Sequence, residues 1–138
     1  MNAHKKIFIT DIPFPPTSNH RYQPRRGRLV LSDKTRSYKE SIQMHLFSKF
    51  RHLDASDFIG KILKIEIDYI GNRSFWFTKQ NKIKQIDVDN RHKSILDGIF
   101  PFIKLNDSQA FTVTLNKIVS DDYKEVLVNV TISEMELS

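Results

Sequence analysis

The sequence contains no cysteine, only four glycines and no long hydrophobic run. Without cysteine the chain can form neither a disulfide scaffold nor a thiolate zinc site, which fits a reducing compartment. The apolar run after Lys6 is too short for a signal peptide, and no stretch reaches the roughly 20 apolar residues that span a bilayer. The lack of a glycine-rich phosphate loop argues against a nucleotide-driven motor. We therefore expect a cytoplasmic protein that does not associate with membranes.

The length of 138 residues fits a single domain covering residues 1–138. A chain of this length can bury a hydrophobic core without the help of disulfides or a structural metal. Internal repeats and low-complexity tracts are absent from the sequence. The functional residues are therefore expected to belong to one folded unit.

Positive charge is concentrated in the N-terminal part of the chain. The net charge is +6, and residues 1–60 hold 11 basic and 5 acidic side chains, whereas residues 61–138 hold 11 of each. The excess is densest at Arg21, Arg25, Arg26 and Arg28. Basic side chains gain free energy by releasing counterions from nucleic acid, so this distribution favours a polyanionic partner. A solvated basic surface is the alternative explanation.

Hydrophobic periodicity predicts the elements of the first half of the chain. Residues 6–10 are predicted to form a strand that the following prolines end. The segment 17–31 is polar and basic, and we expect a long loop there. From Ser32 to about Arg51, apolar residues recur every fourth position, which predicts a helix. Apolar residues alternate with charged ones over 63–69, which predicts a half-buried strand.

The second half adds a helix and two strands. Asp89 and Asn90 are predicted to cap a helix that Pro101 stops. Alternating apolar residues over 111–115 and 126–132 predict two strands joined in a β-hairpin. The predicted order is β-α-β-α-β-β. We expect an α/β (α+β) domain with one mixed sheet of about four strands and two helices on one face.

Three acidic residues and one lysine stand near the predicted ends of these elements. Asp87 and Asp89 lie just before the second helix, and Asp107 lies just before the third strand. Residues two apart on an extended segment point to the same side, and one turn of helix brings Lys93 to nearly the same face. Mg²⁺ in proteins is usually held by one or two carboxylates together with water and substrate phosphates. The pattern therefore predicts a metal site that acts on phosphates.

The chemistry expected of such a site is hydrolysis of a phosphodiester. A divalent ion would polarise a phosphodiester oxygen and activate a water, while Lys93 could neutralise the developing negative charge. Each residue also has an ordinary interpretation. Asp87 can be a surface residue, Asp89 a helix cap, Asp107 a turn residue and Lys93 an exposed helical lysine.

Several short motifs follow one another along the chain. They are Pro15-Pro16-Thr17-Ser18-Asn19, Asp87-Val88-Asp89-Asn90, Lys93, Leu96-Asp97 and Asn106-Asp107-Ser108-Gln109. The set resembles the RusA family of Holliday junction resolvases, whose pattern is Pro-Pro-Ser-x-Asn, Asp-x-Asp-Asn, a lysine four residues later, Leu/Phe-Asp and Asp-Asp-x-Gln. The resemblance covers nearly the whole chain in order. One departure is Asn106, which stands where the family often has another aspartate.

The resemblance implies a homodimeric crossover junction endodeoxyribonuclease. Such an enzyme would bind four-way DNA junctions and make paired symmetric nicks with Mg²⁺ or Mn²⁺, in DNA recombination and repair. It implies that Asp87, Asp89 and Asp107 are the catalytic metal ligands and that Lys93 is the catalytic lysine. The DNA-binding residues that we expect beside them are Asn19, Arg21, Arg25, Arg26, Arg28, Lys79, Lys82 and Lys84.

Two other readings of the sequence are open. The same fold could hold branched nucleic acid without cutting it, although a pure polyanion binder gains nothing from clustered carboxylates. A phosphatase with an aspartate nucleophile normally has a buried apolar strand before its Asp-x-Asp, and residues 82–86 are too polar for that.

The aromatic run Phe75-Trp76-Phe77 could belong to the core, to a dimer interface or to a wedge inserted into DNA.

Overall fold

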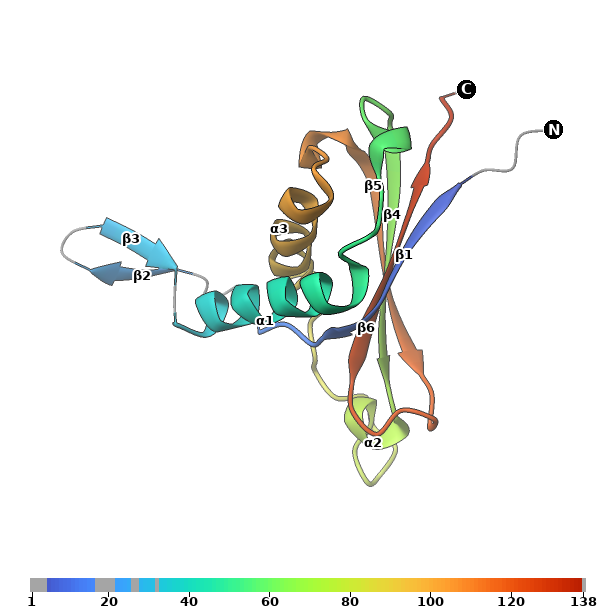
Figure 1. The fold of residues 1–138 in the computed structure, drawn as a ribbon. Helices are drawn as coiled ribbons and strands as arrows, with labels where there is room; N and C mark the ends of the chain where they lie inside the picture. The colour runs from blue at the N-terminus through green and yellow to red at the C-terminus, as the bar shows by residue number, and fades with distance from the viewer. Residues whose placement is uncertain (1–4, 17–21, 26–27, 32, 138) are drawn as a thin grey trace.

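The computed structural model describes residues 5–16, 22–25, 28–31 and 33–137, and it contains a four-stranded mixed sheet (Figure 1). The sheet order is β1-β6-β4-β5, where β4 and β5 run parallel and the other neighbours run antiparallel. The strands are β1 (Lys6–Pro13), β4 (Leu63–Gly71), β5 (Ala110–Val119) and β6 (Leu127–Glu134). The mixed four-stranded sheet expected from the sequence is confirmed, but the predicted β-hairpin of the last two strands is wrong, because β4 lies between β5 and β6 and pairs with both.

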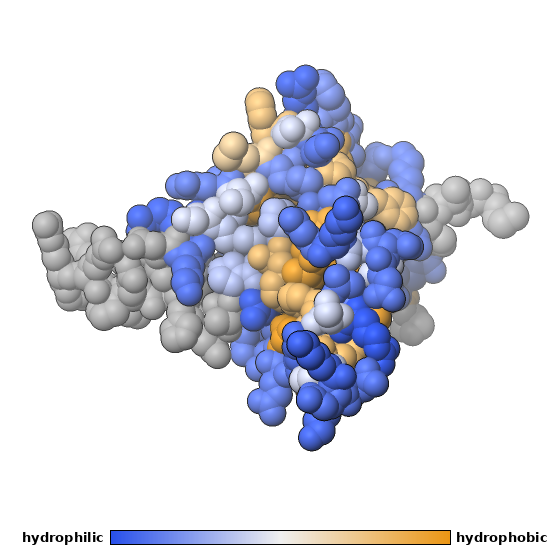
Figure 2. Space-filling model, turned by 90° about the horizontal axis from the view of Figure 1, so that it is seen from below, coloured by the Kyte–Doolittle hydropathy of each residue, from blue (hydrophilic) through white to orange (hydrophobic). Residues whose placement is uncertain are grey.

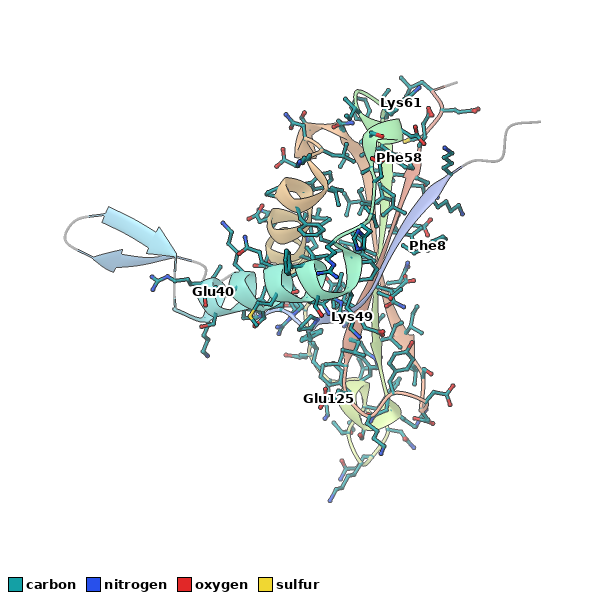
Figure 3. All side chains as sticks on the ribbon, in the orientation of Figure 1. Phe8, Glu40, Lys49, Phe58, Lys61 and Glu125 are labelled. Carbon is teal, nitrogen blue, oxygen red and sulfur yellow. The ribbon has the colours of Figure 1, made fainter. Side chains whose placement is uncertain are left out.

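Two long helices, α1 (Asp33–Phe50) and α3 (His92–Ile103), lie on the same face of this sheet (Figure 1). The side chains of Ile65, Ile67 and Tyr69 on β4 are fully buried beneath them. The opposite face stays open to solvent, and Phe8 on β1 points to that side (Figure 3) with 58% of its surface exposed. The alternation of apolar and polar residues therefore sorts the two faces of the sheet, as expected.

The two helices approach each other closely at Gly98. A Cβ atom at this position would lie 2.4 Å from Cγ2 of Ile42 on α1, which only a glycine avoids. Ile42 and Leu46 of α1 and Ile95 and Ile99 of α3 are all fully buried in the same core. None of the helices among the described residues combines the length and the apolar character needed to cross a bilayer.

The long loop predicted over residues 17–31 is wrong for its second part. The structure has two short antiparallel strands there, β2 (Tyr22–Arg25) and β3 (Arg28–Leu31), in a separate two-stranded sheet. Leu29, Val30 and Leu31 favour extended backbone, and pairing with β2 satisfies hydrogen bonds that a loop would leave to water. Basic residues masked this signal because they broke the alternation of apolar residues.

The predicted limits of the second helix are also wrong at both ends. The helix α3 begins at His92 after a turn in which the Arg91 amide donates to the Val88 carbonyl at 3.1 Å, so Asp89 does not cap it. Pro101 lies inside the helix, which continues to Ile103. The proline forfeits one backbone hydrogen bond, but the extra turn buries Ile103 in the core.

A short helix, α2 (Arg73–Trp76), follows β4 at the lower end of the molecule (Figure 1). Its N-cap is Asn72, whose side-chain oxygen accepts the Phe75 amide at 3.0 Å. Sequence periodicity could not predict this helix because four residues are too few to show a repeat. The chain then returns from α2 toward the start of α3.

Candidate active site

The segment Asp87–Asp89, here called the acidic segment, lies between α2 and the start of α3. Ile86 and Val88 pack against the hydrophobic core, whereas Asp87 and Asp89 are exposed. The Tyr69 hydroxyl at the lower end of β4 donates to the Val88 carbonyl at 3.3 Å. The apolar residues thus anchor the segment while its two carboxylates stay available to a metal ion.

Arg91 holds the acidic segment against the N-terminal arm. Its Nε donates to the Asp87 carbonyl at 2.8 Å, and its Nη1 donates to the Pro15 carbonyl at 2.5 Å. The guanidinium also lies 4.6 Å from the centre of the Phe14 ring, a cation–π distance. The fork of donors on arginine therefore fixes the backbone of Asp87, and no described residue forms a hydrogen bond or an ion pair with its carboxylate.

The electrostatics of this region depend on burial and on the two acids. Burial lowers the pKa of Arg91, and the negative charge of Asp87 acts in the opposite direction. Burial also raises the pKa of Tyr69, an effect that Arg91 opposes and that the charge of Asp89 reinforces. Arginine stays protonated in proteins, so a half-buried cation offsets part of the repulsion between the two carboxylates.

Neither Arg91 nor Tyr69 was singled out from the sequence as a functional residue. Arg91 could have been noticed as a basic residue inside the Asp-x-Asp-Asn motif, between the acids and Lys93. Tyr69 could have been noticed as the polar-tipped end of an otherwise aliphatic run. Their contacts with Pro15 and Val88 join distant parts of the chain, which periodicity does not reveal.

Lys93 lies on the first turn of α3, and its side chain is exposed. In the described part of the chain, no ion pair joins its ammonium group to Asp87 or Asp89. The lysine is therefore close in sequence to the two acids and is not neutralised by either of them. Its charge can act on an approaching phosphate.

Asp107 lies at the other end of the fold. It begins a short 3₁₀ helix, Asp107–Gln109, in which the Gln109 side-chain amide nitrogen donates to the carbonyls of Phe58 and Lys61 at 2.8 and 2.9 Å. Phe58 and Lys61 are labelled at the upper end in Figure 3, just before β4 begins. The acidic segment instead contacts Tyr69. This residue lies six positions after the first residue of β4, Leu63, which is about 20 Å along the strand.

Within one chain the structure therefore brings Asp87, Asp89 and Lys93 into one neighbourhood and leaves Asp107 apart. Among the described residues, no group of three or more histidine or acidic side chains could hold a metal ion. The two carboxylates of the acidic segment still fit Mg²⁺, which takes one or two protein carboxylates and completes its shell with water and phosphate oxygens.

The expected DNA-binding residues fall into two groups. Lys79, Lys82 and Lys84 are exposed on the loop that follows α2. Arg25 and Arg28 lie on β2 and β3, respectively, and pair with each other across the two strands. Asn19, Arg21 and Arg26 lie outside the described residues.

The aromatic run is mostly packed inside the molecule. Trp76 is buried, and its indole nitrogen donates to the Ile118 carbonyl at 2.9 Å. Phe75 is half-buried and packs edge-to-face against Phe14 and Trp76. Of the three alternatives, core packing describes all three residues, since Phe77 also packs against the core while it lines the cavity described below.

Comparison with known proteins agrees with these motifs. A family model described as "Endodeoxyribonuclease RusA" matches residues 13–131, which includes the acidic segment and most of the 138-residue chain. The match defines the protein as one of the endonucleases that act on DNA. More narrowly, the chain belongs to the RusA family, and this membership implies a Holliday junction resolvase. No curated protein sequence matches the chain.

Proposed function

We propose that this protein is a divalent-metal-dependent endonuclease that resolves four-way DNA junctions by paired nicks, in DNA recombination and repair in the cytoplasm. One observation carries the proposal. In a chain of the RusA family, Tyr69 and Arg91 hold the acidic segment by its backbone and leave both carboxylates exposed. A segment built only for stability would use these carboxylates as caps or ion-pair partners.

The proposed reaction follows from the chemistry of the residues in this neighbourhood. Mg²⁺ or Mn²⁺, when bound, would supply Lewis-acid activation of the phosphodiester and of the attacking water. Asp87 and Asp89 would bind the ion through their carboxylate oxygens. Lys93 would stabilise the negative charge that develops on the phosphate oxygens. Arg91 would keep the two acids at a fixed separation throughout the reaction.

A homodimer would supply both the symmetry of cutting and the missing aspartate. Two nicks on opposite strands require two active sites, which a two-fold dimer provides. Because Asp107 lies near the start of β4, about 20 Å along that strand from Tyr69 and the acidic segment of its own chain, we propose that it serves the acidic segment of the second copy. The two ends of the fold would then meet across the dimer.

The edge strand β5 is the surface that we propose for this contact. Its free edge carries the exposed apolar residues Phe111, Val113 and Val119. Two β5 strands paired antiparallel around Val113 would set Lys117, the neighbour of Tyr69 in the sheet, opposite Gln109 of the second copy. Asp107 of that copy would then lie at the level of the acidic segment.

Cleavage of a labelled synthetic four-way junction tests the function, with linear duplex and single-stranded DNA as controls. With Mg²⁺ we expect paired nicks on the junction alone, and Asp89→Asn should reduce the rate by at least roughly 100-fold. The variant should bind the junction at least as tightly as the wild type, because a negative charge near phosphate is removed. Circular dichroism of Asp89→Asn should match the wild type.

Other outcomes would identify the alternative. Tight binding of the junction without cutting in Mg²⁺ or Mn²⁺ would indicate a non-cleaving branched-DNA-binding module. Loss of folded structure in Asp89→Asn would show that this carboxylate stabilises the fold.

A further inference from the structure

A cavity of about 650 Å³ lies between α2 and the loop 77–84 that follows it. This loop, here called the basic loop, closes through a bridge between Phe77 and Ile83 and a hydrogen bond from the Thr78 amide to the Lys82 carbonyl at 2.8 Å. It lies at the lower end of the molecule, whose surface is mainly hydrophilic around a hydrophobic centre (Figure 2). The two contacts that close the basic loop give it a defined backbone path, so the cavity beside it belongs to the folded structure.

The cations around this cavity are held by neutral groups. Arg73 donates from Nη2 to the Asn81 side-chain oxygen at 3.1 Å, and its guanidinium lies 4.8 Å from the centre of the Phe77 ring. The Lys84 ammonium donates to the Ser74 carbonyl at 2.7 Å. These contacts orient two positive charges without neutralising them, and each cation keeps unused N–H donors.

Three lysines elsewhere in the described chain are instead paired with acidic side chains. Lys5, Lys61 and Lys64 each form an ion pair, with Asp57, Glu134 and Glu66 respectively. Of the acids near the cavity, Asp121 accepts the backbone amide of Arg73 at 3.1 Å and is not paired with its guanidinium. A cavity with two oriented, uncompensated cations is suited to a phosphate group.

The position of the cavity relates it to the acidic segment. Lys84 precedes Asp87 by three residues, so the two backbones are separated by no more than about 10 Å. Phosphates of one strand follow each other every ~3.4 Å along a DNA duplex axis. A strand whose phosphate lies at the acidic segment therefore has another phosphate near the cavity, within about three nucleotides.

We propose that this cavity, the basic pocket, binds one backbone phosphate of the cut strand within about three nucleotides of the scissile phosphate. The proposal rests on the proposed function, because it places the pocket on the same DNA strand as the acidic segment. Arg73 and Lys84 would contact the phosphate oxygens, and Lys79 would add charge at the rim. The contact would fix which phosphodiester reaches the two aspartates.

The test uses junctions in which a single phosphate is replaced by an uncharged methylphosphonate, moved one nucleotide at a time from the cut position. Binding is measured by fluorescence anisotropy without divalent metal, so that no strand is cut. For the wild type we expect one substitution within about three nucleotides to weaken binding roughly tenfold. Arg73→Gln should weaken binding to the unmodified junction by a similar factor and should be insensitive to that substitution.

Three further variants distinguish loss of a phosphate contact from misfolding of the basic loop. Lys79→Gln removes a charge from the rim without breaking a side-chain hydrogen bond among the described residues, and it should lower the slope of log K against log salt. Lys64→Gln removes an equal charge from the open sheet face, where Glu66 already pairs with it, and should leave binding unchanged. Arg73→Lys should retain part of the affinity because the charge is kept.

The pocket proposal would be overturned if the methylphosphonate weakened binding of Arg73→Gln by the same factor as binding of the wild type. It would also be overturned if Lys64→Gln weakened junction binding as much as Arg73→Gln. Cleavage of the unmodified junction by the wild type is recorded separately. If the wild type cuts but shows no coupling, only the pocket fails. If it binds with the expected coupling but does not cut, the pocket stands as a binding site and the nuclease function fails.

Discussion

At the scale of single residues, Arg91 binds a carbonyl, that of Pro15, which lies 76 positions away in the sequence. It bonds the carbonyls of Asp87 and Pro15 and covers the Phe14 ring. A guanidinium can do this because its donors diverge in one plane, which a lysine ammonium cannot reproduce. The acidic segment thereby gains a fixed backbone while its carboxylates remain exposed.

We predict that Arg91→Ala lowers the turnover of junction cleavage by roughly 10- to 100-fold with little change in KM. The Asp87 backbone would lose its partner, so the two carboxylates would sample other separations. Arg91→Lys should recover only part of the loss, and added guanidinium ions at millimolar concentration should partly rescue Arg91→Ala. Single-turnover kinetics with the synthetic junction provide the measurement.

A different pattern would assign Arg91 another role. Weakened junction binding with unchanged turnover would mean that its guanidinium contacts DNA directly. Equal losses for Arg91→Ala and Arg91→Lys, with no chemical rescue and a lowered melting temperature, would indicate a purely structural role.

At the scale of elements, α1 and α3 form one layer whose spacing is set by Gly98. The helix α1 is also tied to β1, because the Tyr38 hydroxyl donates to the Pro13 carbonyl at 2.8 Å and His45 Nε2 lies 2.8 Å from the Thr10 carbonyl. The start of α3 carries Lys93 and follows the acidic segment directly. The packing of the two helices therefore decides where the proposed catalytic residues lie relative to the sheet.

We predict that Gly98→Ala lowers the free energy of unfolding by about 1–3 kcal/mol, because the new methyl group would overlap Cγ2 of Ile42. The higher helix propensity of alanine offsets part of this, by up to about 1 kcal/mol. Urea unfolding monitored by circular dichroism measures the change. In a protein that already carries Ile42→Ala, Gly98→Ala should lower the free energy of unfolding by much less, because Cγ2 and Cδ1 of Ile42 are no longer present. A more stable Gly98→Ala protein would show that the helices can separate without loss.

At the scale of the whole molecule, the proposed active site is divided between the two ends of the fold. The sheet carries Tyr69 at its lower end and the Asp107 turn at its upper end. In a closed two-fold dimer, an antiparallel orientation of the two copies brings the upper end of each beside the lower end of the other. The proposed β5 contact supplies that orientation and leaves the basic pocket on the same side as the acidic segment of its own chain.

Mixing two inactive variants tests this arrangement. A dimer of one Asp89→Asn chain and one Asp107→Asn chain would contain one intact site if the aspartates act across the interface, and none if they act within a chain. After random subunit exchange, we expect about a quarter of the wild-type number of sites, appearing as single nicks in the junction. Sedimentation must first show a dimer, and a purely monomeric protein that still cuts would contradict the arrangement.

The sequence by itself determined the alternation of the sheet strands, the apolar stripes of the two long helices and the motifs of the RusA family. These features are local, since they depend on side-chain periodicity and on short spacings between residues. Sequence also singled out the acidic segment, because two carboxylates beside a lysine are unusual in a basic chain.

Only the tertiary structure decided what lies near the acidic segment and what does not. Arg91 and Tyr69 support it through contacts between distant parts of the chain, and Pro101 stays helical because its turn buries Ile103. Asp107 follows the acidic segment by only 18 residues, yet the straight path of α3 carries it to the opposite end of the sheet. A linear sequence gives the spacing of residues, but the direction of the elements between them sets their distance in space.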